Sequence, residues 1–377
     1  MAAMATAVAA TGLQLDREAR KNPAVAPWVP SAFQAYAAAP LAREAYARGE
    51  FEDGAAYART YVRRRPIPAE GLSLLTMNLL GEDKEREALP ALLLASQRGW
   101  RDTYTQLLIT SSAEQVGESE VASQRLLALW RLQHREGPTQ DLTANLLSMP
   151  GGPQAFANGL DKADLWITPF LTWAITQNVP STSLETIADA IAEKSVPVDC
   201  SLISGPLRTM ARRGAGEAAQ TVWSRSCPDD NARAEVGEFA FRKSSAPPGP
   251  SDWAFPRHAG LTTSLVSGPA GIGLDYRNTE HMRVSVAQRI TALKPGEYVL
   301  SLDYLSGDAM NKQPIVLKLT CYTQDGQNGP AARLWMKDEA QVIRIPDEGC
   351  NGQEFALLVA HGSGTIGQFN LEPASAN

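Results

Sequence analysis

The chain has 377 residues, of which 44% are hydrophobic, and its formal net charge is −6. This length exceeds that of one compact domain, so we expect at least two hydrophobic cores. The acidic balance supplies no broad basic field of the kind that holds phosphates, which excludes nucleic acid from the expected partners.

The first residues, MAAMATAVAATGLQLDREAR, are small and apolar up to the first charge at Asp16. They lack the positively charged start of a signal peptide. No segment of the chain reaches the roughly 18 consecutive apolar residues that read as a transmembrane helix. Two interpretations of residues 1–35 stay open: the trailing end of an inner-membrane anchor, or simply a leader.

Residues 36–136 repeat with a period of 34 residues. Sliding the chain by that interval superposes small, apolar and turn residues in three copies. The superposed sets are Gly54, Ala88 and Ala122; Ala58, Leu92 and Leu126; and Gly49, Asp83 and Gly117. The period and the pattern resemble the tetratricopeptide repeat family.

That resemblance implies antiparallel helix pairs whose small residues let the backbones approach, with a surface that docks a protein partner. Pro66 stands where the family ends its second helix with proline, whereas Trp100 and His134 stand there in the next two copies. The triple arginine Arg63–Arg65 falls at the same helix end, where cations offset the carbonyl end of the helix dipole. An acidic polymer or anionic headgroups are the alternative partners of this run.

Residues 137–240 continue as helical hairpins, which we expect to leave the 34-residue register. The last of them, SGPLRTMARRGAGEAAQTVWSRSCP, reads as two helices around a glycine turn. Cys200 precedes this hairpin and Cys227 ends it. A disulfide between them would cap the last hairpin of a solenoid, which has no further neighbour.

The serines, prolines and glycines of residues 241–252 predict a linker. Beyond it, residues 253–377 alternate apolar and polar residues with period two, for example at Phe355, Leu357 and Val359. Short strands of this kind predict an antiparallel β-sandwich. The predicted fold class is therefore α+β, with an N-terminal helical solenoid followed by a C-terminal sandwich.

The order of the segments WAFP, LKPGEYVLSLDY and GTIGQFNLEP resembles the galactose-binding-like, jelly-roll modules that accompany bacterial glycan enzymes. The whole arrangement is similar to that of uncharacterised envelope proteins of proteobacteria. The resemblance implies a role near exopolysaccharide assembly or export, with a polysaccharide bound at the sandwich.

The cysteines fall into two local pairs, Cys200 with Cys227 and Cys321 with Cys350, and neither pair has CxxC spacing. Each pair lies within one predicted structural region, so we predict two local disulfides. Such bonds persist in the periplasm or outside the cell. The alternative is four reduced, buried thiols in a cytosolic protein.

No catalytic constellation stands out, and we expect neither a metal nor a cofactor nor enzymatic activity. None of the four histidines has a partner at the i, i+4 spacing of a helical metal site. Aromatic rings can stack on the flat faces of sugars, and four of them fall beside predicted loops of the sandwich. The candidate glycan-binding residues are Trp253, Tyr276, Tyr322 and Trp335.

Three functions remain open. The first is a non-enzymatic envelope scaffold whose repeats dock a protein and whose sandwich binds a glycan. The second is a polysaccharide hydrolase or lyase, which requires two carboxylates or a Tyr/His pair in one cleft of the sandwich. The third is a structural subunit of an oligomer or fibre.

Overall fold

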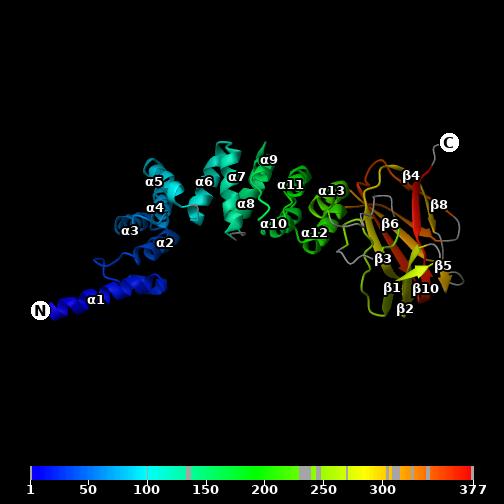
Figure 1. Ribbon diagram of the computed structural model, residues 1–377, viewed down its shortest axis with the longest axis horizontal. Coiled ribbons are helices and arrows are strands. Elements are labelled where there is room, and N and C mark those ends of the chain that lie inside the picture. The colour runs from blue at the N-terminus through cyan, green and yellow to red at the C-terminus, as the bar shows by residue number, and fades with distance from the viewer. Residues whose placement is uncertain are drawn as a thin grey trace. The chain divides into compact units, whose positions relative to one another are not determined.

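The computed structural model describes residues 2–99, 101–132, 137–228, 239–242, 248–268, 271–302, 305–307, 315–323, 327–336 and 340–374. Over these residues, thirteen α-helices and one 3-10 helix precede eleven strands. Figure 1 shows the helices in the first part of the chain and the strands in the last. This order confirms the predicted α+β class. Trp100 and His134, which depart from the repeat pattern, lie outside the described residues.

The chain divides into two compact units, residues 1–159 and residues 160–377. The predicted domain limits stay predictions, and part of the predicted linker, residues 243–247, lies outside the described residues. Within the described part of the chain, no helix is both long and apolar enough to cross a bilayer.

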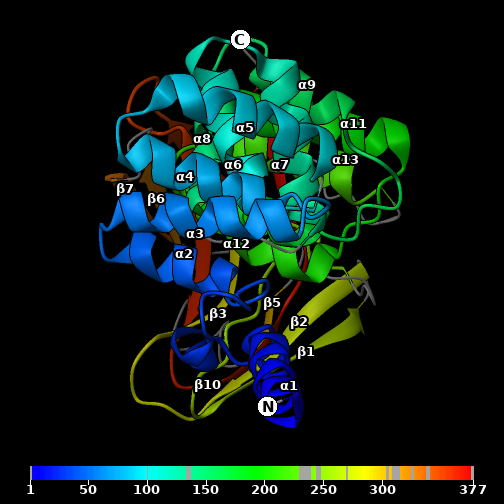
Figure 2. The same cartoon turned by 90° about the vertical axis from the view of Figure 1, so that its left-hand side faces the viewer.

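The first unit starts with α1 (Ala2–Ala19) and the 3-10 helix η1 (Pro23–Trp28) and continues as helical hairpins. The hairpins are α2 (Ala38–Ala47) with α3 (Phe51–Arg64), α4 (Glu70–Gly81) with α5 (Glu85–Arg98), α6 (Thr103–Gln115) with α7 (Ser119–Arg131), and α8 (Pro138–Ser148) with α9 (Gly152–Asn158). Figure 2 shows α2 to α5 side by side, and each of these helices contacts the next.

The 34-residue period appears in the structure as a recurring turn. Helices α3, α5 and α7 begin at residues 51, 85 and 119. A residue with positive φ precedes each of them: Gly49 at 76°, Asp83 at 59° and Gly117 at 78°. Gly151 at 75° repeats the turn before α9, so the register continues one hairpin further than we expected from the sequence.

Small residues at the repeated positions allow the close approach of the helices. A Cβ added at Gly54 of α3 would lie 1.8 Å from Oδ1 of Asn78 in α4. Ala88 and Ala122, at the equivalent positions of α5 and α7, are buried. Side-chain volume at these positions therefore sets the distance between neighbouring helices.

Arginines at the ends of α3 and α5 also link two of the hairpins to the segments before them. Arg64 donates from Nη1 to the carbonyl oxygen of Ala32, at 2.9 Å. Arg98, one period later, donates from Nη1 to the carbonyl oxygen of Pro66, at 2.7 Å. The last arginines of α3 and α5 thus fix the loop that leads into their own hairpin. Arg64 is exposed, as expected for a helix end in solvent, and it binds this loop as well.

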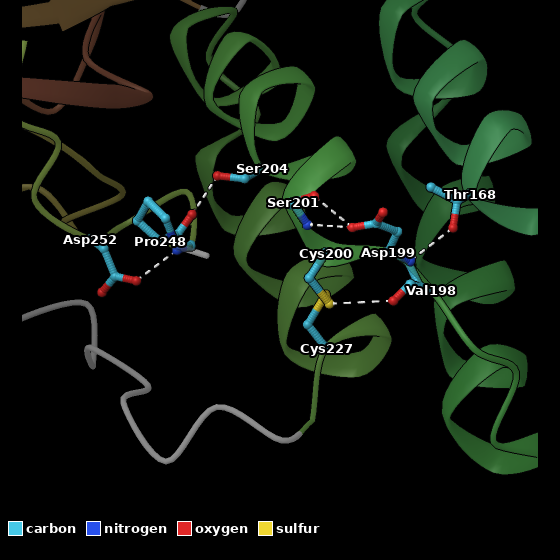
Figure 3. Close-up of a disulfide and its surroundings, with 10 residues drawn as sticks. Thr168, Val198, Asp199, Cys200, Ser201, Ser204, Cys227, Pro248 and Asp252 are labelled. Atoms are coloured by element: carbon cyan, nitrogen blue, oxygen red, sulfur yellow. Dashed lines mark hydrogen bonds between the residues drawn. A yellow bond between two sulfur atoms is a disulfide. The ribbon is translucent and has the colours of Figure 1, made fainter. Parts of the chain in front are cut away.

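The second unit begins with two further hairpins, α10 (Ile167–Thr176) with α11 (Ser181–Lys194) and α12 (Cys200–Arg212) with α13 (Gly216–Ser226). Figure 3 shows the start of α12, where Asp199 caps the helix by accepting the N–H of Ser201 at 3.0 Å. The N–H of Asp199 donates to Oγ1 of Thr168 at 2.9 Å, which ties this cap to α10.

Three antiparallel sheets follow in the same unit. Their strands are β1 (Leu261–Gly268), β2 (Gly271–Asn278), β3 (Val284–Thr291), β4 (Gly296–Leu302), β5 (Leu305–Gly307), β6 (Val316–Tyr322), β7 (Asn328–Trp335), β8 (Gln341–Ile345), β9 (Gly352–Val359), β10 (Gly362–Ile366) and β11 (Phe369–Pro373). The sheet orders are β1-β2-β10-β5, β11-β4-β8 and β3-β9-β6-β7.

One hydrophobic core gathers side chains from all three sheets, including Leu274 of β2, Leu300 of β4 and Phe355 of β9. The period-two alternation decides which residues enter it, because successive side chains of a strand point to opposite faces. Phe355, Leu357 and Val359 are buried, as their alternation predicted.

Both predicted disulfides form, which confirms the pairing inferred from the sequence. Cys200, at the start of α12, bonds to Cys227, just after α13, with 6.0 Å between the Cα atoms (Figure 3). Cys321 of β6 bonds to Cys350, which precedes β9, with 4.7 Å between the Cα atoms. The two bonds indicate an oxidising compartment, outside the cell or in the periplasm.

Candidate functional site

The second unit has a cavity of about 590 Å³ beside β1. Residues 239–242 and 248–257 supply two of its walls, and β1 with the start of β2 supplies another. Its lining includes Arg242, Asp252, Trp253, Phe255, Arg257 and Thr263.

Trp253 fixes the wall formed by residues 248–257. Its Nε1 donates to the carbonyl oxygen of Phe239 at 2.8 Å, and its ring meets that of Phe239 edge-on, with centroids 6.0 Å apart. Ala254 forms an isolated antiparallel bridge with Gln288 of β3. These contacts hold an irregular segment against the sandwich without a regular strand.

Arg208 of α12 holds the other end of the same wall. Its Nη2 donates to the carbonyl oxygens of Gly249 and Asp252, each at 2.9 Å. The Asp252 carboxylate accepts the N–H of Gly249 at 2.6 Å. Burial lowers the pKa of the Arg208 guanidinium, and the Asp252 charge partly offsets this. The cavity wall is thereby attached to the last helical hairpin.

The lining offers both charge and hydrogen-bonding groups to a ligand. Arg242 and Arg257 contribute two guanidinium groups, against the single carboxylate of Asp252 among the described lining residues. Thr263 and Ser264 of β1 add hydroxyl groups, while Phe255, Pro256, Leu261 and Leu265 supply apolar surface. A polar ring with an apolar face and a negative charge would satisfy all of these groups.

A second polar cluster joins α12 to the sheet β3-β9-β6-β7. Arg212 donates from Nη2 to Oε1 of Glu354 at 3.0 Å and from Nε to Oε2 at 3.3 Å. The hydroxyl of Tyr322 donates to the same carboxylate. Burial alone would raise the pKa of Glu354, but the hydrogen bonds from Arg212 and Tyr322 lower it below its ordinary value. Burial, together with the hydrogen bond to Glu354, raises the pKa of Tyr322 to about 12.

The four aromatic residues proposed from the sequence lie in different places. Trp253 and Tyr276 are only 6% and 4% exposed and belong to the sandwich core, so neither presents a free ring face to a sugar. Trp335 is 50% exposed, and the guanidinium of Arg283 lies 5.1 Å from its ring centroid. Tyr322 is half-buried against Glu354.

These residues do not form one site. Trp335 pairs with Val316 at the start of β6, whereas Tyr322 ends the same strand. At about 3.3 Å per residue the two lie about 20 Å apart along the strand. Of the four, Trp253 alone lines the described cavity. A glycan-binding role for Trp335 and Tyr322 stays a prediction.

The arginines of the cavity were not among the residues selected from the sequence. Arg242 lies inside the predicted linker, residues 241–252, and Arg257 lies just beyond it.

The described residues offer no candidate metal site. Among the described residues, no group of three or more His, Cys, Asp and Glu side chains could hold an ion. His281 and His361 stack with centroids 5.7 Å apart, at an exposed position between β2 and β3 and after β9.

No protein-family model matches the chain, and no curated protein matches it. Solved structures give only distant likenesses. The accessory secretory proteins 1, 2 and 3 of Streptococcus pneumoniae share 14% identity over 37% of this chain and 96% of theirs, with a TM-score of 0.28. A CBM61 module solved with β-1,4-galactotriose shares 16% over 38% of this chain and 97% of that one, with a TM-score of 0.23.

The CBM22-1 and GH10 modules of a Clostridium thermocellum xylanase, solved with xylohexaose, share 9% identity over 33% of this chain and 26% of theirs. Their TM-score is 0.24. All three scores lie well below 0.5, so these likenesses identify neither the family nor the ligand of this chain.

Proposed function

We propose that the protein is a non-enzymatic binding protein of the cell envelope, in which the sandwich holds an acidic saccharide and the helical repeats dock a protein partner. The observation that carries the proposal is the cavity beside β1, with its two arginines, its hydroxyl groups and its apolar wall. Its volume of about 590 Å³ lies in the range of small-molecule sites.

A uronic acid or another anionic sugar suits this lining. Guanidinium groups bind carboxylates through paired N–H···O bonds. The hydroxyl groups of Thr263 and Ser264 can exchange hydrogen bonds with the hydroxyl groups of a sugar, and the C–H face of the ring can rest on Phe255 and Leu265. Each part of such a ligand finds a group of matching chemistry.

The carboxylate count favours binding over hydrolysis. Most glycoside hydrolases place two carboxyl groups across the scissile bond. The described lining of this cavity has one, Asp252, and its Oδ2 already accepts the N–H of Gly249. The lining therefore supports recognition of a sugar more directly than cleavage.

The helical repeats supply the protein-docking part of the proposal. Leu89 and Leu93, one turn apart on α5, are more than half exposed and form an apolar stripe on the helix surface. Repeat solenoids bind partners through such extended surfaces. With the oxidising compartment indicated by the disulfides, this arrangement fits a scaffold in exopolysaccharide assembly or export.

The test is a binding screen of the full chain against acidic and neutral polysaccharides, followed by calorimetry on the best ligand. We expect polygalacturonate or a similar acidic polymer to bind, and Arg257→Gln to weaken its binding at least tenfold. Arg283→Gln is the matched control, because Arg283 carries the same charge but lies beside Trp335.

Two results would contradict the proposal. Binding of no glycan by the full chain would remove the saccharide from it. Binding that is lost in Trp335→Ala but retained in Arg257→Gln would move the site from the cavity to the surface at Trp335.

A further inference from the structure

A small cleft in the first unit has a different chemistry from the cavity of the sandwich. It measures about 260 Å³ and lies where the end of α1, η1, α2 and the loop between α3 and α4 meet. Its charged lining consists of Arg20, Arg43, Arg65 and Glu70, and tyrosine rings and prolines form the rest of its walls. Three guanidinium groups thus share one cleft with one carboxylate.

The carboxylate is already satisfied within the protein. Arg43 of α2 forms an ion pair with Glu70 at the start of α4. The hydroxyl of Tyr61 donates to Oε2 of the same carboxylate at 3.1 Å. Burial, together with the nearby charge of Glu70, raises the pKa of Tyr61 to about 12, so this hydroxyl keeps its proton. One positive and one negative charge cancel, and two guanidinium groups remain.

Those two groups, Arg20 and Arg65, contact aromatic rings. The guanidinium carbon of Arg65 lies 3.9 Å from the ring centroid of Tyr36 and 5.8 Å from that of Tyr61. That of Arg20 lies 5.5 Å from the ring centroid of Tyr36. Within the described part of the chain, neither guanidinium makes a hydrogen bond or an ion pair.

Stacking leaves the binding edge of a guanidinium free. Where a guanidinium lies parallel to a ring, the ring covers its flat face, while the N–H groups lie in the plane and point outward. A guanidinium held on a ring also loses less conformational entropy when it binds an anion. Arg20 and Arg65 therefore form a fixed pair of donors around Tyr36.

Buried contacts hold Tyr36 in place. Asp16 of α1 is buried, and its Oδ1 accepts the backbone N–H groups of Ala35, Tyr36 and Ala37 at 2.8, 2.8 and 2.9 Å. This carboxylate binds the backbone just before α2, so its charge is met by three donors. Tyr36, which lies between the two arginines, is therefore held in place before any ligand binds.

We propose that this cleft is an oxyanion-binding site, in which Arg20 and Arg65 hold a carboxylate or phosphate group. The group has two possible sources, a free small anion or an acidic residue of a glycan. The cleft has room for several water molecules, and so for one such group with part of the molecule that carries it.

The test measures binding of four probes to the full chain by calorimetry: inorganic phosphate, glucuronate, an oligomer of galacturonate and neutral glucose. We expect at least one anionic probe to bind and to raise Tm, with an affinity that falls as salt rises. Glucose should not bind at this site. In a chain that also carries Arg257→Gln, Arg65→Gln and Arg20→Gln should each weaken the binding at least tenfold.

Two controls keep the result specific. Arg63→Gln removes the same charge two residues from Arg65, where the guanidinium contacts Oγ1 of Thr60 instead of the cleft, and it should bind as the unmodified protein does. Arg257→Gln distinguishes binding at the cleft from binding at the sandwich cavity. Arg257 lines only the cavity, so this substitution should leave the binding of glucuronate to the cleft unchanged. Arg20 is exposed, so Arg20→Gln is expected to fold even where Arg65→Gln does not.

The outcomes are distinct. Tighter binding of the oligomer than of glucuronate supports the site and identifies a polymeric source, whereas phosphate or glucuronate binding without that gain supports the site with a free anion. Absence of binding by all three anions overturns the proposal. So does binding that survives both Arg20→Gln and Arg65→Gln in a chain that also carries Arg257→Gln, where the sandwich cavity no longer contributes.

Discussion

Arg212 and Glu354 connect α12 to β9 through a paired hydrogen bond that Tyr322 completes. The carboxylate is mostly buried, so its charge is stable only while these donors remain. The same cluster explains why Tyr322 is not free to stack on a sugar. Tyr322 was selected for its aromatic ring, but the hydrogen bond from its hydroxyl group to Glu354 fixes its position.

This cluster predicts a pH dependence of stability. The folded pKa of Glu354 lies below the ordinary value of 4.5, so its contribution is present at neutral pH and disappears as the pH falls through the folded pKa. We expect Glu354→Gln to lower the free energy of unfolding by about 1–2 kcal/mol at pH 7. The difference from the unmodified protein should shrink below about pH 4.

Denaturant titrations of both proteins between pH 3 and pH 7 measure this difference. A gap that stays constant across the range would show that the ionised form of Glu354 contributes nothing.

At the scale of elements, the packing of α3 against α4 depends on the absence of a side chain at Gly54. We predict that Gly54→Val destabilises the first unit by about 1–3 kcal/mol, because its atoms would overlap the buried Asn78. Thermal unfolding of the full chain measures the effect.

Gly205 of α12 is the opposite case and the control. It is exposed, and apart from its chain neighbours and the nearby backbone of its own helix, a Cβ there would meet nothing within 4 Å. Gly205→Ala should therefore stabilise its helix by about 0.5–1 kcal/mol. Equal effects at the two glycines would mean that helix propensity, rather than close approach, governs Gly54.

The disulfide Cys200–Cys227 encloses a loop with a sequence separation of 27 residues. In the chain-entropy model, closing a loop of this size stabilises by about 3 kcal/mol. We expect the double substitution Cys200→Ala and Cys227→Ala to lower Tm by several degrees. Calorimetry with and without a reductant checks this, since the reductant should lower the Tm of the double variant less than that of the unmodified protein.

At the scale of the whole molecule, periodicity made most of the fold predictable. The 34-residue repeat predicted the helical hairpins, the period-two alternation predicted the strands, and cysteine spacing predicted both disulfides. These features are local in the sequence, so a short window contains them. The turn at Gly151 was not recognised from the sequence. Its residue pattern in the helices differs from that of the first three copies, although the turn itself is kept.

The candidate sites were less predictable because they depend on contacts between distant segments. The sandwich cavity needs residues 239–242, 248–257 and β1 together, and no window contains all three. The cleft of the first unit joins Arg20 to Arg65 through Tyr36. Tyr276 was judged by its nearness to a loop, whereas its parity with Leu274 on β2 places it in the core.

The arginine links that recur along the first unit have a mechanical consequence. Arg64 and Arg98 each fasten one hairpin to the segment just before it, and such nearest-neighbour coupling lets a solenoid open one repeat at a time. If force were applied to the ends of the first unit, its hairpins would open one after another, and the unit would lengthen in short steps. In the second unit, the disulfide between Cys200 and Cys227 would limit the extension of the residues that it encloses.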